Sequence, residues 1–229
     1  MNNLRLRNSI LLTTLFVSLL WCVKSAEFLF HWDLGQWGVR PLTELGLAGI
    51  IAAPLIHGSL EHLFNNTLPI LILGTVLLYG YPRSRWRVIT LVWLVSGVGV
   101  WLFARPASHI GASGLIHGIF FYLLLVSILR RDKRSVAIMM IAFFMYGGMT
   151  MTIFPTEEGI SFEYHFFGAF AGLVSALLWY KRDPKLKEKS YIWQQRDIDD
   201  PLIGDQWQET TVASEKPEND PPSEPFRYH

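Results

Sequence analysis

The sequence predicts an all-α membrane protein, a bundle of six transmembrane helices with both termini in the cytoplasm. Hydrophobic residues make up 51% of the 229 residues, and apolar runs of membrane-spanning length recur from about residue 10 to residue 180. A transmembrane helix needs about 20 apolar residues, and a soluble helical core does not hide six such runs. The predicted spans are residues 9–28, 62–80, 86–103, 113–129, 135–153 and 164–180.

The distribution of basic residues predicts the orientation of these spans. Basic side chains precede the first span and follow the second, fourth and sixth, whereas the alternate loops carry only Lys24, Arg40 and Arg105. Cytoplasmic loops are enriched in Lys and Arg, so both termini are expected inside. The compact size without a targeting extension favours a multi-pass protein of the bacterial inner membrane. The basic residues on the predicted cytoplasmic side are Arg5, Arg7, Arg83, Arg85, Arg87, Arg130, Arg131, Lys133, Arg134, Lys181, Arg182, Lys185, Lys187 and Lys189.

We expect two regions along the chain. Residues 1–183 form the six-span membrane domain, whose long first outer loop covers about residues 29–61 and carries aromatic residues typical of the bilayer interface. Residues 184–229 are polar and rich in proline, so we expect a disordered cytoplasmic tail. Cys22 is the single cysteine, which excludes an intrachain disulfide. A cleaved signal peptide is the alternative interpretation of the first run, but Lys24 lies beside a weak cleavage site.

Ser113 is the first candidate for chemistry, because Gly111-Ala112-Ser113-Gly114 opens the fourth apolar run. A serine at the start of a helix has free backbone N–H groups and the positive end of the helix dipole beside it. These features stabilise the negative charge that develops when a serine attacks a carbonyl group. The alternative is that Ser113 only caps the helix.

His165 is the candidate base, because it begins the sixth run. On a helix His165, Gly168 and Gly172 share one face, and Gly114 and Gly118 form a matching pair in the fourth run. Small residues at such spacing let two transmembrane helices approach closely. A hydrogen bond between a serine and a histidine on two helices requires that approach. The alternative is that His165 is only hydrogen-bonded to a backbone carbonyl group.

His62 and Asn66 lie four residues apart, so they share one helical face at the start of the second run. Both are neutral hydrogen-bond donors, suited to an oxyanion hole. A metal site is the alternative, because His57 precedes His62 by five residues, but the sequence matches neither zinc-protease pattern, H-E-x-x-H or H-x-x-E-H. We therefore expect no metal and no cofactor.

The three motifs together resemble those of the rhomboid intramembrane serine proteases, in the same order and across residues 40–180. They are H-x4-H-x3-N from His57, G-x-S-G from Gly111 and H-x2-G-x3-G from His165. The resemblance implies a Ser113–His165 dyad without an acidic member, with His62, Asn66 and the Ser113 backbone N–H binding the oxyanion. It also implies that His57 and Arg40 support the first loop, and that the loop at residues 155–163 is a cap that moves to admit water and substrate.

His117 departs from the family pattern, since many members carry a tyrosine four residues after the nucleophile that stacks on the catalytic histidine. His117 lies one helical turn from Ser113 and is expected either to stack on His165 or to act as a rival base; we favour His165 as the base.

The expected substrates are single-span proteins within the lipid bilayer. The alternative function is a non-catalytic rhomboid-like chaperone or adaptor that binds membrane helices. A transporter is disfavoured, because the later spans lack acidic residues for ion coupling. The net charge of +1 gives no indication of nucleic-acid binding, and none is expected. The sequence leaves the oligomeric state open.

Overall fold

The computed structural model describes residues 2–155 and 161–185, which belong to one compact unit. Residues 156–160 of the expected cap, and the expected tail from residue 186 onward, lie outside the described residues. The described helices are α1 (Asn2–Phe30), η1 (Leu34–Trp37), α2 (Glu44–Ala52), η2 (Ala53–Leu55), α3 (Leu60–Pro69), η3 (Ile70–Gly74), α4 (Thr75–Gly80), α5 (Arg85–Phe103), α6 (Ser113–Arg130), α7 (Lys133–Tyr146), η4 (Gly147–Thr150) and α8 (Phe162–Trp179).

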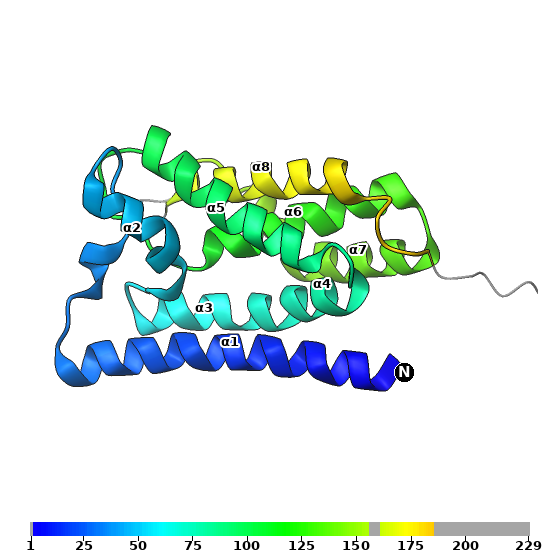
Figure 1. The fold of residues 1–229 in the computed structure, drawn as a ribbon, viewed down its shortest axis with the longest axis horizontal. Helices are drawn as coiled ribbons and strands as arrows, with labels where there is room; N and C mark the ends of the chain where they lie inside the picture. The colour runs from blue at the N-terminus through cyan, green and yellow to red at the C-terminus, as the bar shows by residue number, and fades with distance from the viewer. Residues whose placement is uncertain (1, 156–160, 186–229) are drawn as a thin grey trace, which may run out of the picture. The chain divides into compact units, whose positions relative to one another are not determined.

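The long helices form a bundle around α6 (Figure 1). Helix α6 is the most buried of the long apolar helices and packs against α5, α7, α8 and η3. Helix α1 lies along α3 and α4 at the edge of the bundle. Helices α3, α6 and α8 all begin at one end of the bundle, here called the Ser113 end, and α6 finishes at the opposite, Arg130 end. The N-terminal positions of three helices therefore meet at one end.

Five of the described helical segments are long and apolar enough to cross a membrane: Asn3–Phe30, Leu60–Gly80, Arg85–Phe103, Ser113–Arg130 and Phe162–Trp179. They agree with five of the predicted spans to within a few residues, apart from the longer start of the first. The second is continuous through α3, η3 and α4, although Pro69 lacks a backbone N–H; it is followed by the π-helical turn Ile70–Gly74, a common response to a disturbed helical hydrogen-bond ladder.

The predicted fifth span, residues 135–153, is not one long helix. Helix α7 has 14 residues and stops at Tyr146, where Gly147 and Gly148 begin the short 3-10 helix η4. Glycine weakens an α-helix because its backbone loses more freedom on folding. An α-helix of this length extends about 21 Å, less than the hydrocarbon core of about 30 Å. The count of six spans therefore stays a prediction.

The first loop is folded against the loop that precedes α6. It contains η1, α2 and η2, and the side chain of Thr43 caps α2 by accepting a hydrogen bond from Gly46 N at 3.1 Å. Val39 and His109 exchange two backbone hydrogen bonds of 2.9 and 3.0 Å. These contacts connect the first loop to the segment that leads into Ser113.

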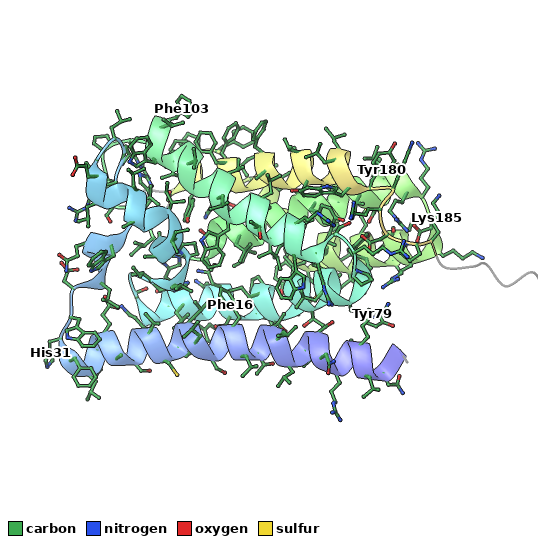
Figure 2. The ribbon with its side chains drawn as sticks, viewed as in Figure 1. Phe16, His31, Tyr79, Phe103, Tyr180 and Lys185 are labelled. Atoms are coloured by element: carbon green, nitrogen blue, oxygen red, sulfur yellow. The ribbon has the colours of Figure 1, made fainter. Side chains whose placement is uncertain are left out.

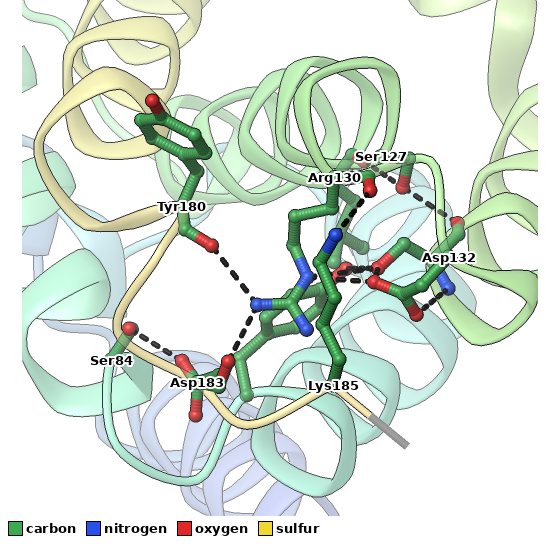
Figure 3. A network of polar contacts seen from close by, with 10 residues as sticks. Ser84, Ser127, Arg130, Asp132, Tyr180, Asp183 and Lys185 are labelled. Atoms are coloured by element: carbon green, nitrogen blue, oxygen red, sulfur yellow. Dashed lines mark hydrogen bonds and ion pairs between the residues drawn. The ribbon is translucent and has the colours of Figure 1, made fainter. Parts of the chain in front are cut away.

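A buried polar network around Arg130 joins three chain segments at the Arg130 end (Figure 3). Arg130 is 6% exposed; its Nε donates to Asp132 at 2.9 Å, and its Nη1 donates to the carbonyl oxygens of Tyr180 and Asp183 at 2.9 and 2.7 Å. The Asp183 carboxylate accepts from Ser84 Oγ at 2.5 Å and from Arg83 N at 2.7 Å. The network thus joins the α4–α5 turn, the α6–α7 turn and the segment after α8. Figure 2 shows Tyr79, Tyr180 and Lys185 at this end, and His31 and Phe103 at the other.

Candidate active site

Ser113 is the first residue of α6 and does not act as its cap. The N-cap position is Ala112, with no side-chain cap hydrogen bond. The Ser113 side chain is partly exposed, and its backbone N–H is one of the first four of the helix, which have no partner within it. The structure therefore gives no support to the capping alternative.

The loop before Ser113 is fixed by backbone contacts with the first-loop segment. Gly111 N donates to Ala53 O at 2.9 Å, and Ala112 N donates to His57 Nε2 at 3.4 Å. Gly111 has φ +112°, a conformation that favours glycine, and a Cβ added to it would lie 2.6 Å from Cε1 of His62. Glycine at this position allows both the turn into Ser113 and the approach of the His62 ring.

Helices α6 and α8 touch backbone to backbone along their glycine faces. A Cβ added to Gly168 would lie 2.1 Å from Gly114 O, and one added to Gly172 would lie 2.1 Å from Gly118 O. A Cβ on Gly114 would lie 3.0 Å from the carbonyl oxygen of Tyr164. The residue after Ser113 thus contacts the residue before His165, as close packing through small residues permits.

His165 lies in the first turn of α8 and is 7% exposed. Its Nδ1 is 3.0 Å from the carbonyl oxygen of Thr152. A carbonyl oxygen only accepts hydrogen bonds, so Nδ1 carries the hydrogen of the neutral ring and Nε2 carries the lone pair. Within the described residues no hydrogen bond joins Ser113 Oγ to His165; in resting enzymes such bonds are often longer than in the reacting complex.

His117 stacks face to face on His165, with ring centroids 3.9 Å apart and planes 11° from parallel. Its Nδ1 is 2.7 Å from the carbonyl oxygen of Ser113, and its Nε2 is 2.8 Å from Oγ1 of Thr152. Both ring nitrogens of His117 therefore have a hydrogen-bond partner, whereas among the described residues His165 has one at Nδ1 alone.

His62 and Asn66 lie beside the same loop. The Asn66 side chain is 5% exposed and donates one hydrogen bond from Nδ2 to His62 O at 3.0 Å. A primary amide has two hydrogens, so one remains for another acceptor. The His62 ring packs edge to face on His57 with centroids 5.1 Å apart and faces Gly111. The structure thus brings both predicted oxyanion donors to the Ser113 end.

His57 and Arg40, the two residues expected to support the first loop, differ in burial. His57 is 1% exposed, and burial, together with the neighbouring His62, lowers its pKa to about 3; the ring is neutral and accepts the Ala112 N–H through Nε2. Arg40 lies in the turn before α2, where its carbonyl oxygen accepts hydrogen bonds from Thr43. Its side chain is exposed, so its backbone provides these contacts. Among the described residues no three His, Cys, Asp or Glu side chains are grouped for a metal ion.

The sequence did not identify Thr152, which contacts both stacked histidines, because Thr152 lies 13 residues from His165 in an irregular segment. It also did not identify the two contacts that hold the start of α8. His109 Nδ1 is 2.6 Å from Ser161 Oγ, and Arg105 Nε is 3.2 Å from the Glu163 carboxylate. Ser161, a serine directly before an apolar helical run, has the sequence signature of an N-cap.

Comparison with known proteins identifies the family. The sequence pattern of the family described as "Rhomboid domain" matches residues 45–182. Proteins of Mycobacterium tuberculosis and Mycobacterium bovis, both named as uncharacterized, are 38% identical over 173 residues, which is 71% of this chain and 72% of theirs. An uncharacterized protein of Mycobacterium leprae is 35% identical over 174 residues, 71% of this chain and 68% of its own. With its apolar helices, the chain is an integral multi-pass membrane protein and belongs to the rhomboid family.

Proposed function

We propose that this protein is an intramembrane serine endopeptidase that cleaves transmembrane substrate helices, with Ser113 as nucleophile and His165 as general base. The observation that carries the proposal is the contact of His165 Nδ1 with the carbonyl oxygen of Thr152 at 3.0 Å, from which the tautomer of the neutral ring follows. The bond from Nδ1 to Thr152 O leaves the Nε2 lone pair available, and the glycine faces bring α8 against the start of α6. Of the two stacked histidines, His165 has the nitrogen suited to remove a proton from a serine.

In the proposed reaction Ser113 Oγ attacks the carbonyl carbon of a substrate peptide bond while His165 Nε2 takes the hydroxyl proton. The Ser113 backbone N–H and the side chains of His62 and Asn66 stabilise the oxyanion. His165 then returns the proton to the leaving amine, and an acyl-enzyme remains. Water hydrolyses it by the same sequence, with His165 as base and then acid.

The Ser113 end faces the outside in this proposal, since the opposite end carries the basic turns that favour the cytoplasm. Water is expected to enter at that end, where the loop at residues 155–163 is the expected cap. The membrane in this proposal is the inner membrane of a bacterium. Backbone groups of a helix in lipid are paired internally, so a substrate must unwind locally. We therefore expect single-span substrates with small or helix-breaking residues near the cleaved bond.

The test compares the wild type with Ser113→Ala and His165→Ala on a model single-span substrate in lipid vesicles. Each variant is expected to lower the cleavage rate by about 10³-fold or more, and Ser113→Ala is expected to lose labelling by a serine-directed fluorophosphonate. Ser18→Ala, which changes an exposed serine of α1, is the matched control and should cleave and label like the wild type.

Two results would contradict the proposal. Retained activity of His165→Ala together with an inactive His117→Ala would make His117 the base. A folded wild type that is neither labelled nor active, yet retains a substrate helix, would favour the chaperone or adaptor function.

A further inference from the structure

The face-to-face contact of His117 and His165 raises a chemical question, because His117 lies one helical turn from Ser113 and His165 begins the helix packed against α6. Either ring is a possible proton acceptor, and a proton on His117 would place a positive charge 3.9 Å from the centre of the His165 ring. Thr152 contacts both rings with two different groups. We propose that Thr152 is a positioning residue that selects His165 as the base. Its carbonyl oxygen accepts the Nδ1 hydrogen of His165 and so leaves the Nε2 lone pair available, and its hydroxyl donates to the Nε2 lone pair of His117. This inference rests on the proposed protease function.

The first half of the selection concerns the Thr152 carbonyl oxygen, 3.0 Å from His165 Nδ1. It gives His165 the orienting partner that an acidic residue supplies in a three-membered triad. A carbonyl oxygen is uncharged, so it fixes the tautomer without adding a buried anion. When Nε2 accepts the serine proton, the Nδ1–H bond to Thr152 persists and becomes a charge-assisted hydrogen bond.

The second half concerns the Thr152 hydroxyl, 2.8 Å from His117 Nε2 and 3.0 Å from Met149 O. Ser113 O takes the Nδ1 hydrogen of His117, so a neutral ring has only a lone pair at Nε2. The single hydroxyl hydrogen has two acceptors in reach, Met149 O and His117 Nε2. In the proposed state it points to His117 and occupies that lone pair, and Met149 O loses its hydrogen bond from Thr152. A charged His117 would require the opposite arrangement, with Nε2–H donating to Oγ1 and the hydroxyl donating to Met149 O.

Burial favours the neutral arrangement. His117 is 3% exposed, and a buried charge without an ionic partner is costly. The acidic side chain near the pair, Glu163, is engaged by Arg105 at 3.2 Å. His62 is the other ionisable group near His165, and it brings no negative charge.

The kinetic test uses two substitutions that differ in one group. Thr152→Val keeps the β-branched shape and the backbone carbonyl but removes the hydroxyl, whereas Thr152→Ser keeps both polar groups. Thr152→Val is expected to lower kcat about tenfold with KM unchanged, because freeing the His117 lone pair disturbs the pairing of the two rings. Thr152→Ser should stay within about twofold of the wild type. An equal loss in both variants, or none in Thr152→Val, would overturn the proposal.

The spectroscopic test does not depend on activity. Nitrogen-15 NMR of histidine-labelled protein in lipid bilayers reports which ring nitrogen is protonated, and His117→Gln and His165→Gln assign the signals. We expect both rings neutral with hydrogen on Nδ1, and in Thr152→Val a change of the His117 Nε2 signal to that of a nitrogen without a hydrogen bond, with His165 unchanged. A doubly protonated His117, or an unchanged Nε2 signal in Thr152→Val, would refute the selection. If the wild type cleaves nothing but shows these signals, the protease function fails while the assignment of the Thr152 contacts stands.

Discussion

His57 illustrates at the scale of one residue how a buried neutral ring holds the loop that presents Ser113. Its Nε2 accepts the backbone N–H of Ala112 at 3.4 Å, directly before the proposed nucleophile. Protonation would put a hydrogen on Nε2 and remove that acceptor, and it would place a charge in an apolar site beside His62. For both reasons the folded protein resists protonation of His57, whose pKa is lowered to about 3.

We predict that His57 makes the fold sensitive to mild acid. The folded-state pKa lies below the ordinary value of 6.5, so the unfolded chain takes up the proton first as the pH falls. The stabilisation is complete above pH 6.5 and is lost progressively towards pH 3. Between pH 7 and 5 the wild type should lose about 2 kcal/mol more stability than His57→Gln, measured by thermal unfolding in detergent at both values. An equal loss in both proteins would show that His57 does not titrate in this range.

The sequence could place single residues where their position depends on local spacing, and their catalytic roles stay predictions. Ser113, His62 and His165 stand in the first turns of α6, α3 and α8, with Asn66 one turn after His62, and these helices begin at one end of the bundle. Thr152 was not predictable, because its two contacts depend on how the segment after η4 packs against α6 and α8. No repeat or spacing in the sequence encodes that arrangement.

The glycine faces of α6 and α8 set the geometry of the site at the scale of helices. Gly114, Gly118, Gly168 and Gly172 could be paired from the sequence, because small residues four apart share a face. The end of α7 at Tyr146 could not be predicted, since the apolar run continues through the glycine pair that stops the helix. Hydrophobicity predicts that a segment enters the membrane, and local backbone preference decides where its helix ends.

We predict that Gly168→Ala separates α6 from α8. The added methyl group would lie 2.1 Å from Gly114 O, a backbone atom that moves only with its helix. Such overpacking costs about 1–3 kcal/mol, and displacement of His165 from Ser113 by about 1 Å should lower cleavage about a hundredfold. Thermal unfolding and the cleavage rate in vesicles measure the two effects.

The matched control for this substitution is Gly58→Ala in the turn before α3, where the added methyl group meets only Cδ1 of Ile110, at an ordinary contact distance of 3.7 Å. It should keep wild-type stability and activity. If Gly168→Ala behaves like this control, the close approach of α6 and α8 is not needed for the site.

The whole unit has its catalytic candidates at one end and the buried polar network around Arg130 at the other. Helix α6 connects them: its 18 residues begin at Ser113 and end at Arg130, a length of about 27 Å. The loop charges predicted that the Arg130 end is basic, but they did not predict that Arg130 is buried. Its burial depends on Tyr180 and Asp183, 50 and 53 residues away in the sequence, and only the tertiary fold brings these groups together.

We predict that the Arg130 end governs stability without affecting chemistry at the Ser113 end. Arg130→Gln would leave Asp132, whose side chain is 11% exposed, without its ionic partner and two backbone carbonyl groups without their donor. Removing one member of a buried ion pair costs about 3–5 kcal/mol, so the thermal unfolding midpoint in detergent should fall clearly. Arg131→Gln changes the adjacent, exposed arginine and should leave the midpoint unchanged. Because distant sites act independently, fluorophosphonate labelling of folded Arg130→Gln should proceed at the wild-type rate, and a slower rate at a temperature where the variant is folded would show that the two ends are coupled through α6.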